Sequence, residues 1–237
     1  MTEALVPPVP PRHLLLPIYL ISSANNTELA PKASILLDHI CQDLEALGLN
    51  PIRANVDEFA QLTQKESQQL ISSVVFVPNT ETLTELCETL PTWHSFVSNN
   101  ESLIVLAVES SADLEHAAAF TNSVKSLGVV FSSDSALDSI TASVLETLCA
   151  QAANSGAWYL VHSFGSGAAV IEPDRDPVLI GTFECGVVNT HGVDEAFMAG
   201  VLNGLAQEWQ PNKAARFGSF VASGVAEIDG EFLAVDE

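Results

Sequence analysis

The stretch VVNTHGVDEAFMAGVLNGLA, Val187 to Ala206, carries the strongest signal for the fold of this chain. Gly192 suits a tight turn, and the residues after it form a helix-length run rich in small side chains. A helix that begins directly after a strand and a turn accepts anions at its first amides. Asp194 and Glu195 stand in that first turn, where acidic groups favour the helix but repel an anionic ligand. The stretch therefore predicts a strand–turn–helix corner that is a working anion site, a damaged one, or a generic turn of small residues.

Short β-type runs alternate with helix-length segments on the N-terminal side of this corner. Such alternation is typical of βαβ units and a mainly parallel sheet covered on both faces. We therefore expect an α/β fold, a three-layer α/β/α sandwich. The expected strands lie within 14–24, 72–79, 102–111, 127–134, 157–173 (two strands around a glycine turn) and 177–190 (one or two strands), and the expected helices span 31–48, 80–90, 112–126, 135–154, 194–208 and 211–226.

The helix expected at 194–208 contains Gly200 and Gly204. Each glycine inside a helix costs on the order of 1 kcal/mol relative to alanine. Close packing of this small side against the sheet is the expected compensation.

The chain is expected to form one domain, residues 13–237, after a flexible, proline-rich tail at residues 1–12. The N-terminal segment has no basic n-region, and prolines interrupt its apolar stretch. It is therefore expected to be neither a signal peptide nor a membrane span, which favours a cytoplasmic protein.

The composition limits the partners that the chain can take. Its 30 acidic residues outnumber its 8 basic ones, for a formal net charge of -22, so we expect no nucleic-acid partner and no membrane partner. A nucleotide would depend on backbone N–H groups and a metal ion, because few cations are available. The four cysteines form no C-x-x-C pair, so no zinc site is expected and the thiols are expected to be free.

The segment from Asn189 to Phe197 resembles the D-T-x-G-A-G-D-A-F signature of the PfkB carbohydrate kinase family, which has a ribokinase-like fold. Residues 198–227 look like the paired C-terminal helices of that family, and residues 159–171 are similar to its strand–glycine turn–strand segment beside the nucleotide. The upstream strands are most similar to the ketohexokinase-like branch. The resemblance implies an ATP-dependent phosphotransferase that acts on an alcohol group of a sugar or nucleoside.

The resemblance also implies roles for individual residues. Glu195 falls on the catalytic base and Asp194 on a glycine, although a one-residue gap would instead make Asp194 the base. Gly192 and Val193 fall on the anion hole. ATP with magnesium is the implied cofactor, but no metal ligand is assigned, because the family's Asn-x-x-Glu pattern is absent near residues 131–138. The implied nucleotide-binding residues are Ser163, Gly165, Gly167 and Thr190.

Departures from the family pattern leave the function open. A carboxylate at position 194 would repel a phosphoryl group about 4 Å away by roughly 1 kcal/mol in water and roughly 4 kcal/mol at an intermediate dielectric. The family's Gly-Gly-Asn substrate motif and its β lid have no counterpart. The first interpretation is a non-catalytic or weakly active subunit that binds a nucleotide or sugar, or regulates a partner.

Two alternatives stand beside that interpretation. One is an active, divergent kinase that uses Glu195 as its base. The other is a structural subunit of an oligomer, without a ligand. The expected partners are accordingly a small-molecule sugar or nucleotide, a second protein, or a second copy of this chain. His162 and His191 flank the nucleotide side and are expected to be structural.

Overall fold

The computed structural model describes residues 18–22, 31–55, 58, 61, 73–76, 103–108, 127–133, 140–163 and 165–228. Within these residues the strands form an eight-stranded sheet in the order β2-β1-β3-β4-β5-β6-β7-β8. The strands are β1 (Ile18–Ser22), β2 (Pro51–Asn55), β3 (Ser73–Phe76), β4 (Leu103–Val108), β5 (Leu127–Ser133), β6 (Trp158–Ser163), β7 (Gly167–Ile171) and β8 (Val178–Ile180).

The sheet is mainly parallel, as the alternation of strands and helices predicts. Every pairing from β2 through β1, β3, β4 and β5 to β6 is parallel, whereas β7 and β8 are added as antiparallel strands. The antiparallel end of the sheet begins at the glycine turn, because a tight turn can only join antiparallel neighbours.

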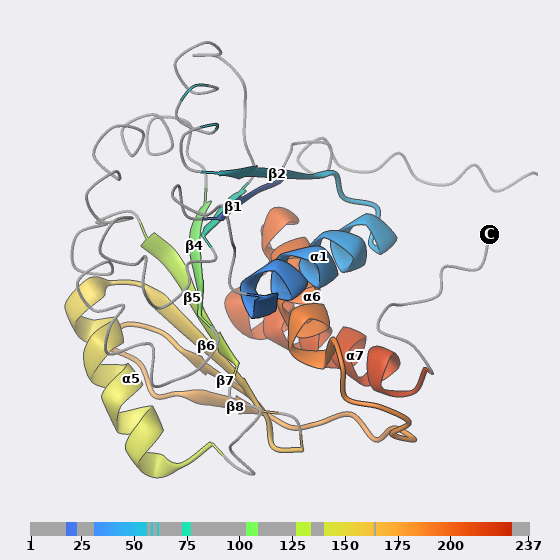
Figure 1. The fold of residues 1–237 in the computed structure, drawn as a ribbon. Helices are drawn as coiled ribbons and strands as arrows, with labels where there is room; N and C mark the ends of the chain where they lie inside the picture. The colour runs from blue at the N-terminus through green and yellow to red at the C-terminus, as the bar shows by residue number, and fades with distance from the viewer. Residues whose placement is uncertain are drawn as a thin grey trace, which may run out of the picture.

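Helices cover both faces of the sheet (Figure 1). α1 (Pro31–Ala46), α6 (Val193–Ala206) and α7 (Pro211–Ala226) gather on one face, and α5 (Ala142–Ser155) lies on the other. This arrangement is the expected three-layer α/β/α sandwich. No helix in the described part of the chain is long and apolar enough to cross a bilayer.

Local sequence signals place the helix ends. Pro31 and Pro211 begin α1 and α7, where a missing N–H costs nothing, and Gly48 follows α1 with a left-handed φ of 79°. α5 begins at Ala142 rather than at 135, because the side chain of Thr141 accepts the N–H of Val144 and caps the helix there.

One strand has no counterpart among the expected elements: Pro51–Asn55 has no apolar run, yet it forms β2 and pairs in register with β1. The segment 177–190 contains one strand, β8, where one or two are expected. The helices expected at 80–90 and 112–126, and the tail at 1–12, lie outside the described residues.

The glycines of α6 pack against α7 and not against the sheet, so that expectation is wrong. A Cβ built on Gly200 would lie 2.8 Å from the Cα of Gly218 on α7, and one on Gly218 would lie 2.6 Å from the carbonyl oxygen of Phe197. Facing glycines let the two helix backbones approach closely. α6 thereby becomes almost wholly buried between α7, α1 and the sheet, which fixes the position of its N-terminus.

Candidate functional site

The glycine turn between β6 and β7 forms one side of the candidate site. Gly165 and Gly167 have φ values of 93° and 92°, which favour glycine, and the N–H of Ser166 donates to the carbonyl oxygen of Ser163 at 3.1 Å. Ser163 itself is fully buried at the end of β6. The turn is therefore built by backbone geometry, as the sequence pattern predicts.

The loop before α6 is tied to the far end of α7. The N–H of Val188 donates to the carbonyl oxygen of Ala226 at 2.8 Å, and the side-chain amide of Asn189 donates to the carbonyl oxygen of Ile228 at 2.8 Å. The other side-chain atom of Asn189, Oδ1, accepts the N–H of His191 at 2.7 Å. Position 189, where the family signature has Asp, thus organises the approach to the helix.

α6 begins without a side-chain cap. Its N-cap is Gly192, with a φ of 77°, and the first helical residue, Val193, is buried. The helix dipole leaves partial positive charge at these amides, and Asp194 and Glu195 in the first turn offset it.

A cavity of about 290 Å³ lies between the glycine turn, the loop at 182–187 and α7. Val193 connects it to the start of α6, and Ser219 and Ser223 of α7 are among the residues that line it. Ser219 is 5% exposed, and its hydroxyl has no hydrogen-bond partner among the described residues. A buried hydroxyl without a partner costs free energy, so a polar ligand atom at this position would satisfy it.

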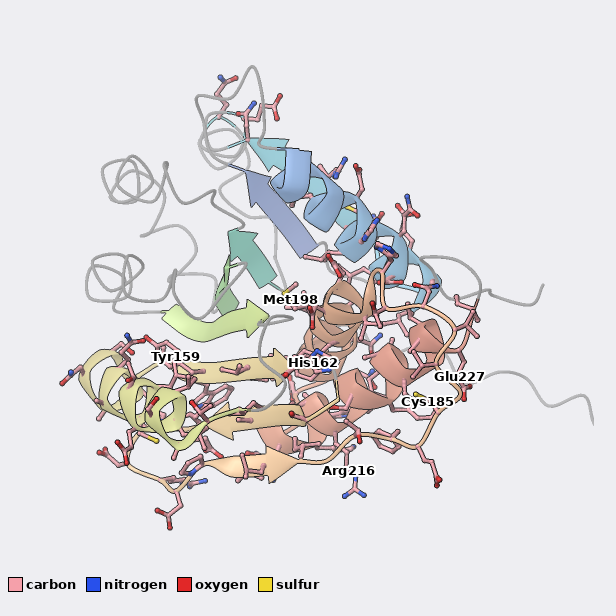
Figure 2. The ribbon with its side chains drawn as sticks, turned by 60° about the horizontal axis from the view of Figure 1, so that its bottom comes forward. Tyr159, His162, Cys185, Met198, Arg216 and Glu227 are labelled. Carbon is pink, nitrogen blue, oxygen red and sulfur yellow. The ribbon has the colours of Figure 1, made fainter. Side chains whose placement is uncertain are left out.

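Asp194 is paired with His162 of β6. The carboxylate Oδ1 lies 2.5 Å from the imidazole Nδ1, and the ring of His162 stacks on Phe197 with centroids 4.5 Å apart. Figure 2 shows His162 beneath α6, between that helix and the sheet. The pair turns the Asp194 carboxylate toward β6 and holds His162 at the edge of the cavity, which it also lines.

Glu195 turns instead toward α1. Its Oε1 lies 3.9 Å from Nδ1 of His39, whose side chain is 9% exposed. Asp43, one helical turn further along α1, is fully buried, and neither carboxylate oxygen has a hydrogen-bond partner among the described residues. Burial, reinforced by the charge of Glu195, raises the pKa of Asp43 to about 7. The candidate base therefore belongs to an acidic cluster between α1 and α6.

The structure brings some of the predicted site residues together and separates others. Glycines of the β6–β7 turn and the first residue of α6 line one cavity, and two carboxylates of α6 point to different neighbours. Gly165, Gly167 and Val193 line the cavity; Ser163, Thr190 and Gly192 lie next to it in the chain without lining it; Asp194 faces β6 and Glu195 faces α1.

The residues that contact Asp194 and Glu195 do not follow from the sequence. The sequence predicts a structural role for His162 without a specific partner, and it gives no role to His39 or Asp43. For the His162–Asp194 pair, one signal is present in the sequence: a histidine inside an otherwise apolar strand. Nothing in the local sequence indicates the contact between Glu195 and His39, because α1 and α6 are about 150 residues apart and touch only in the folded chain.

The charges around the cavity are few. Glu184 and, when protonated, His162 are the charged residues that line it, and no Lys or Arg does so within the described part of the chain. No group of three or more His, Cys, Asp or Glu side chains is placed to hold a metal ion in the described ranges. Cys41, Cys149 and Cys185 are free thiols, as expected, and all three are half-buried.

The His162–Asp194 pair is expected to stabilise the corner. Asp194→Ala should lower the free energy of unfolding by about 1–3 kcal/mol, because it leaves a buried imidazole N–H without an acceptor. Combining it with His162→Phe should restore part of that loss, and chemical denaturation of the four proteins measures the coupling. The exposed Glu146→Ala, on α5, serves as control and should change stability little. Additive losses would show that the two side chains do not interact.

Comparison with known proteins identifies the fold. No protein-family model matches the sequence, and no curated protein sequence matches it. Solved structures do match. A ribokinase from Arabidopsis thaliana, complexed with ribose and ATP, has 11% identity and a TM-score of 0.58, covering 91% of this chain and 94% of that one.

Two other solved structures show the same likeness. An adenosine kinase from Anopheles gambiae, in complex with a di(adenosine-5) tetraphosphate, has 12% identity and a TM-score of 0.61 over 92% of this chain and 77% of that one. The tetrameric inhibited form of phosphofructokinase-2 from Escherichia coli has 14% identity and a TM-score of 0.60, over 90% and 94%. At these identities the likeness shows the fold, and it confirms the ribokinase-like architecture expected from the sequence.

Proposed function

We propose that this ribokinase-like protein binds a nucleotide in the cavity beside α6 and transfers phosphoryl groups weakly or not at all. The cavity carries the proposal: it joins the Gly165–Gly167 turn, the start of α6 at Val193 and Ser219 of α7, whose buried hydroxyl has no partner among the described residues. The structural neighbours crystallised with ATP or a dinucleotide support a nucleotide as the ligand. Ser163 precedes the turn and Thr190 precedes the helix in the chain, so both are proposed to lie near the bound nucleotide.

The surroundings of the two acidic residues support weak transfer. A catalytic base must reach the hydroxyl from which it takes a proton. Asp194 is paired with His162, and Glu195 lies against His39 and near Asp43. The anion hole proposed at Gly192 and Val193 has both carboxylates in the following turn, where they oppose a phosphate. The protein therefore acts through binding, as a regulatory or sensing subunit.

In this proposal, magnesium binds together with the nucleotide and not on its own. Magnesium keeps several waters and is commonly held by one or two carboxylates together with substrate phosphates. The described residues supply no group of three or more ligands for it. We therefore place the metal ion on the nucleotide phosphates rather than in a cage of protein side chains.

Binding and transfer are tested separately. Calorimetry with ATP, ADP and adenosine, with and without magnesium, should detect binding, while an assay of phosphoryl transfer to a panel of sugars and nucleosides should detect little. Transfer at ordinary enzyme rates, about 1–1000 per second, would replace this proposal with an active kinase that uses Glu195 as base. Absence of nucleotide binding would overturn it and leave a structural subunit without a ligand.

Ser219 offers a sharper test of where the nucleotide binds. Ser219→Ala should weaken binding about threefold to tenfold through the loss of one hydrogen bond, while the protein becomes no less stable. Ser223→Ala is the matched control, because Ser223 also lines the cavity but its hydroxyl already donates to the carbonyl oxygen of Phe220 at 2.7 Å. Calorimetry and thermal denaturation measure both effects. Equal losses of affinity in the two variants would contradict a specific contact with Ser219.

A further inference from the structure

β8 is the outermost strand at one edge of the sheet. It pairs with β7 alone, with Leu179 opposite Ala169, and no strand of the described ranges occupies its other side. An edge strand presents backbone N–H and C=O groups that are available to another strand. β8 is therefore able to extend the sheet.

The side chains of β8 divide between the two faces of the sheet. Val178 and Ile180 share one face, where Ile180 packs against the core formed with α6 and α7 and Val178 is 39% exposed, whereas Leu179 points to the opposite face and is 64% exposed. A large aliphatic side chain at an unprotected edge favours burial against a second strand.

A groove of about 680 Å³ runs beside this edge. Residues 178–184 form one side, and Asn212, Lys213 and Arg216 of α7 form the other. Figure 2 shows Arg216 pointing away from α7 toward the side of the outermost strand. Two of the chain's eight basic residues thus line one groove of a protein with net charge -22, and Glu184 is the acidic residue that accompanies them.

The turn that leads into β8 carries the opposite charge. Asp174 and Asp176 are both exposed there, and neither forms an ion pair with another of the described residues. Arg175, between them, donates instead to Glu172 at 3.0 Å. The acidic turn precedes Val178, whereas the basic groove runs along β8 and the residues that follow it, 178–184.

We propose that two copies of this chain pair through β8, antiparallel and centred on Leu179. This register places Leu179 of each copy opposite the other as a cross-strand pair. It also places Asp176 of one copy opposite Thr182 of the second, beside Lys213 and Arg216. A twofold axis makes that contact twice, so the surface is complementary to itself.

The charge pattern favours a second copy over an unrelated partner, because both halves of the complementary contact lie on this one surface. The net charge of each copy opposes association at long range, but salt screens it beyond about 8 Å at physiological ionic strength. β8 is only three residues long, so the interface is small and the dimer forms and dissociates with concentration. The pairing does not depend on the proposed nucleotide binding.

A charge-reversal cycle tests the interface. Sedimentation velocity over a wide concentration range should show a monomer–dimer equilibrium for the full chain. Arg216→Glu and Asp176→Lys should each weaken dimerisation about tenfold, because two like-charge contacts replace two attractive ones. The double variant should recover most of the loss, since the charges are exchanged.

Leu179→Asp should abolish the dimer, and circular dichroism should show all four exposed-site variants to be folded. A protein that is monomeric at every concentration would overturn the proposal. So would a dimer that Leu179→Asp and Arg216→Glu leave intact, because it would form through another surface.

Discussion

Gly167→Ala is expected to destabilise the protein by about 4 kcal/mol, through overpacking and through strain at a positive φ. A Cβ on Gly167 would overlap the carbonyl oxygen of Ile180 and lie 3.0 Å from the carbonyl carbon of Gly181. Both obstacles are backbone atoms, so no side chain can rotate away. The φ of 92° adds strain for any residue with a Cβ. β8 would have to separate from β7, and its three pairings with that strand would be lost.

Gly165→Ala is the matched control. It has the same kind of conformation, with a φ of 93°, but a Cβ there would meet nothing within 4 Å. Its cost should be limited to backbone strain, about 1–2 kcal/mol. Urea denaturation of the two variants and the parent measures the difference. Equal losses at the two positions would show that the contact between Gly167 and β8 does not constrain the fold.

Asp43→Asn is expected to stabilise the protein by as much as about 4 kcal/mol at pH 8, by roughly 1.5 kcal/mol at pH 5, and to have little effect near pH 3. Burial raises the pKa of Asp43 from 3.8 to about 7, and Glu195 contributes to the rise. Between pH 3.8 and about pH 7, the carboxyl group of Asp43 keeps its proton in the folded protein but has lost it in the unfolded chain. Stability therefore falls as pH rises from about 4 to about 7, and the loss is complete above the folded pKa. An amide at this position cannot ionise, so the loss disappears.

Asp38→Asn, on the same helix, is the control for that experiment. Asp38 is half exposed and forms an ion pair with Arg53 at 2.6 Å. Its replacement should leave the fall of stability between pH 5 and pH 8 in place, whereas Asp43→Asn should flatten it. Denaturation midpoints across this pH range decide the matter. A parent protein as stable at pH 8 as at pH 5 would contradict an uncompensated buried carboxylate at position 43.

The ribokinase-like corner illustrates how much of the fold is accessible from local sequence. The strand–turn–helix order around Gly192, the glycine turn at 165–167 and the start of α7 at Pro211 follow from rules that act over a few neighbouring residues. β2 shows the limit of those rules. Its five residues have no strand pattern of their own, and they form a strand because β1 presents an open edge beside them.

The proposed site divides in the same way. The sequence by itself determined the architecture and the corner where an anion site would lie, because apolar periodicity, prolines and glycines act locally. Only the tertiary structure decided what the carboxylates contact: Asp194 meets His162 across 32 residues, and Glu195 meets α1 across more than 150. Burial, charge proximity and an unpartnered hydroxyl such as that of Ser219 arise when distant segments pack together, so these properties belong to the folded chain and not to any stretch of it.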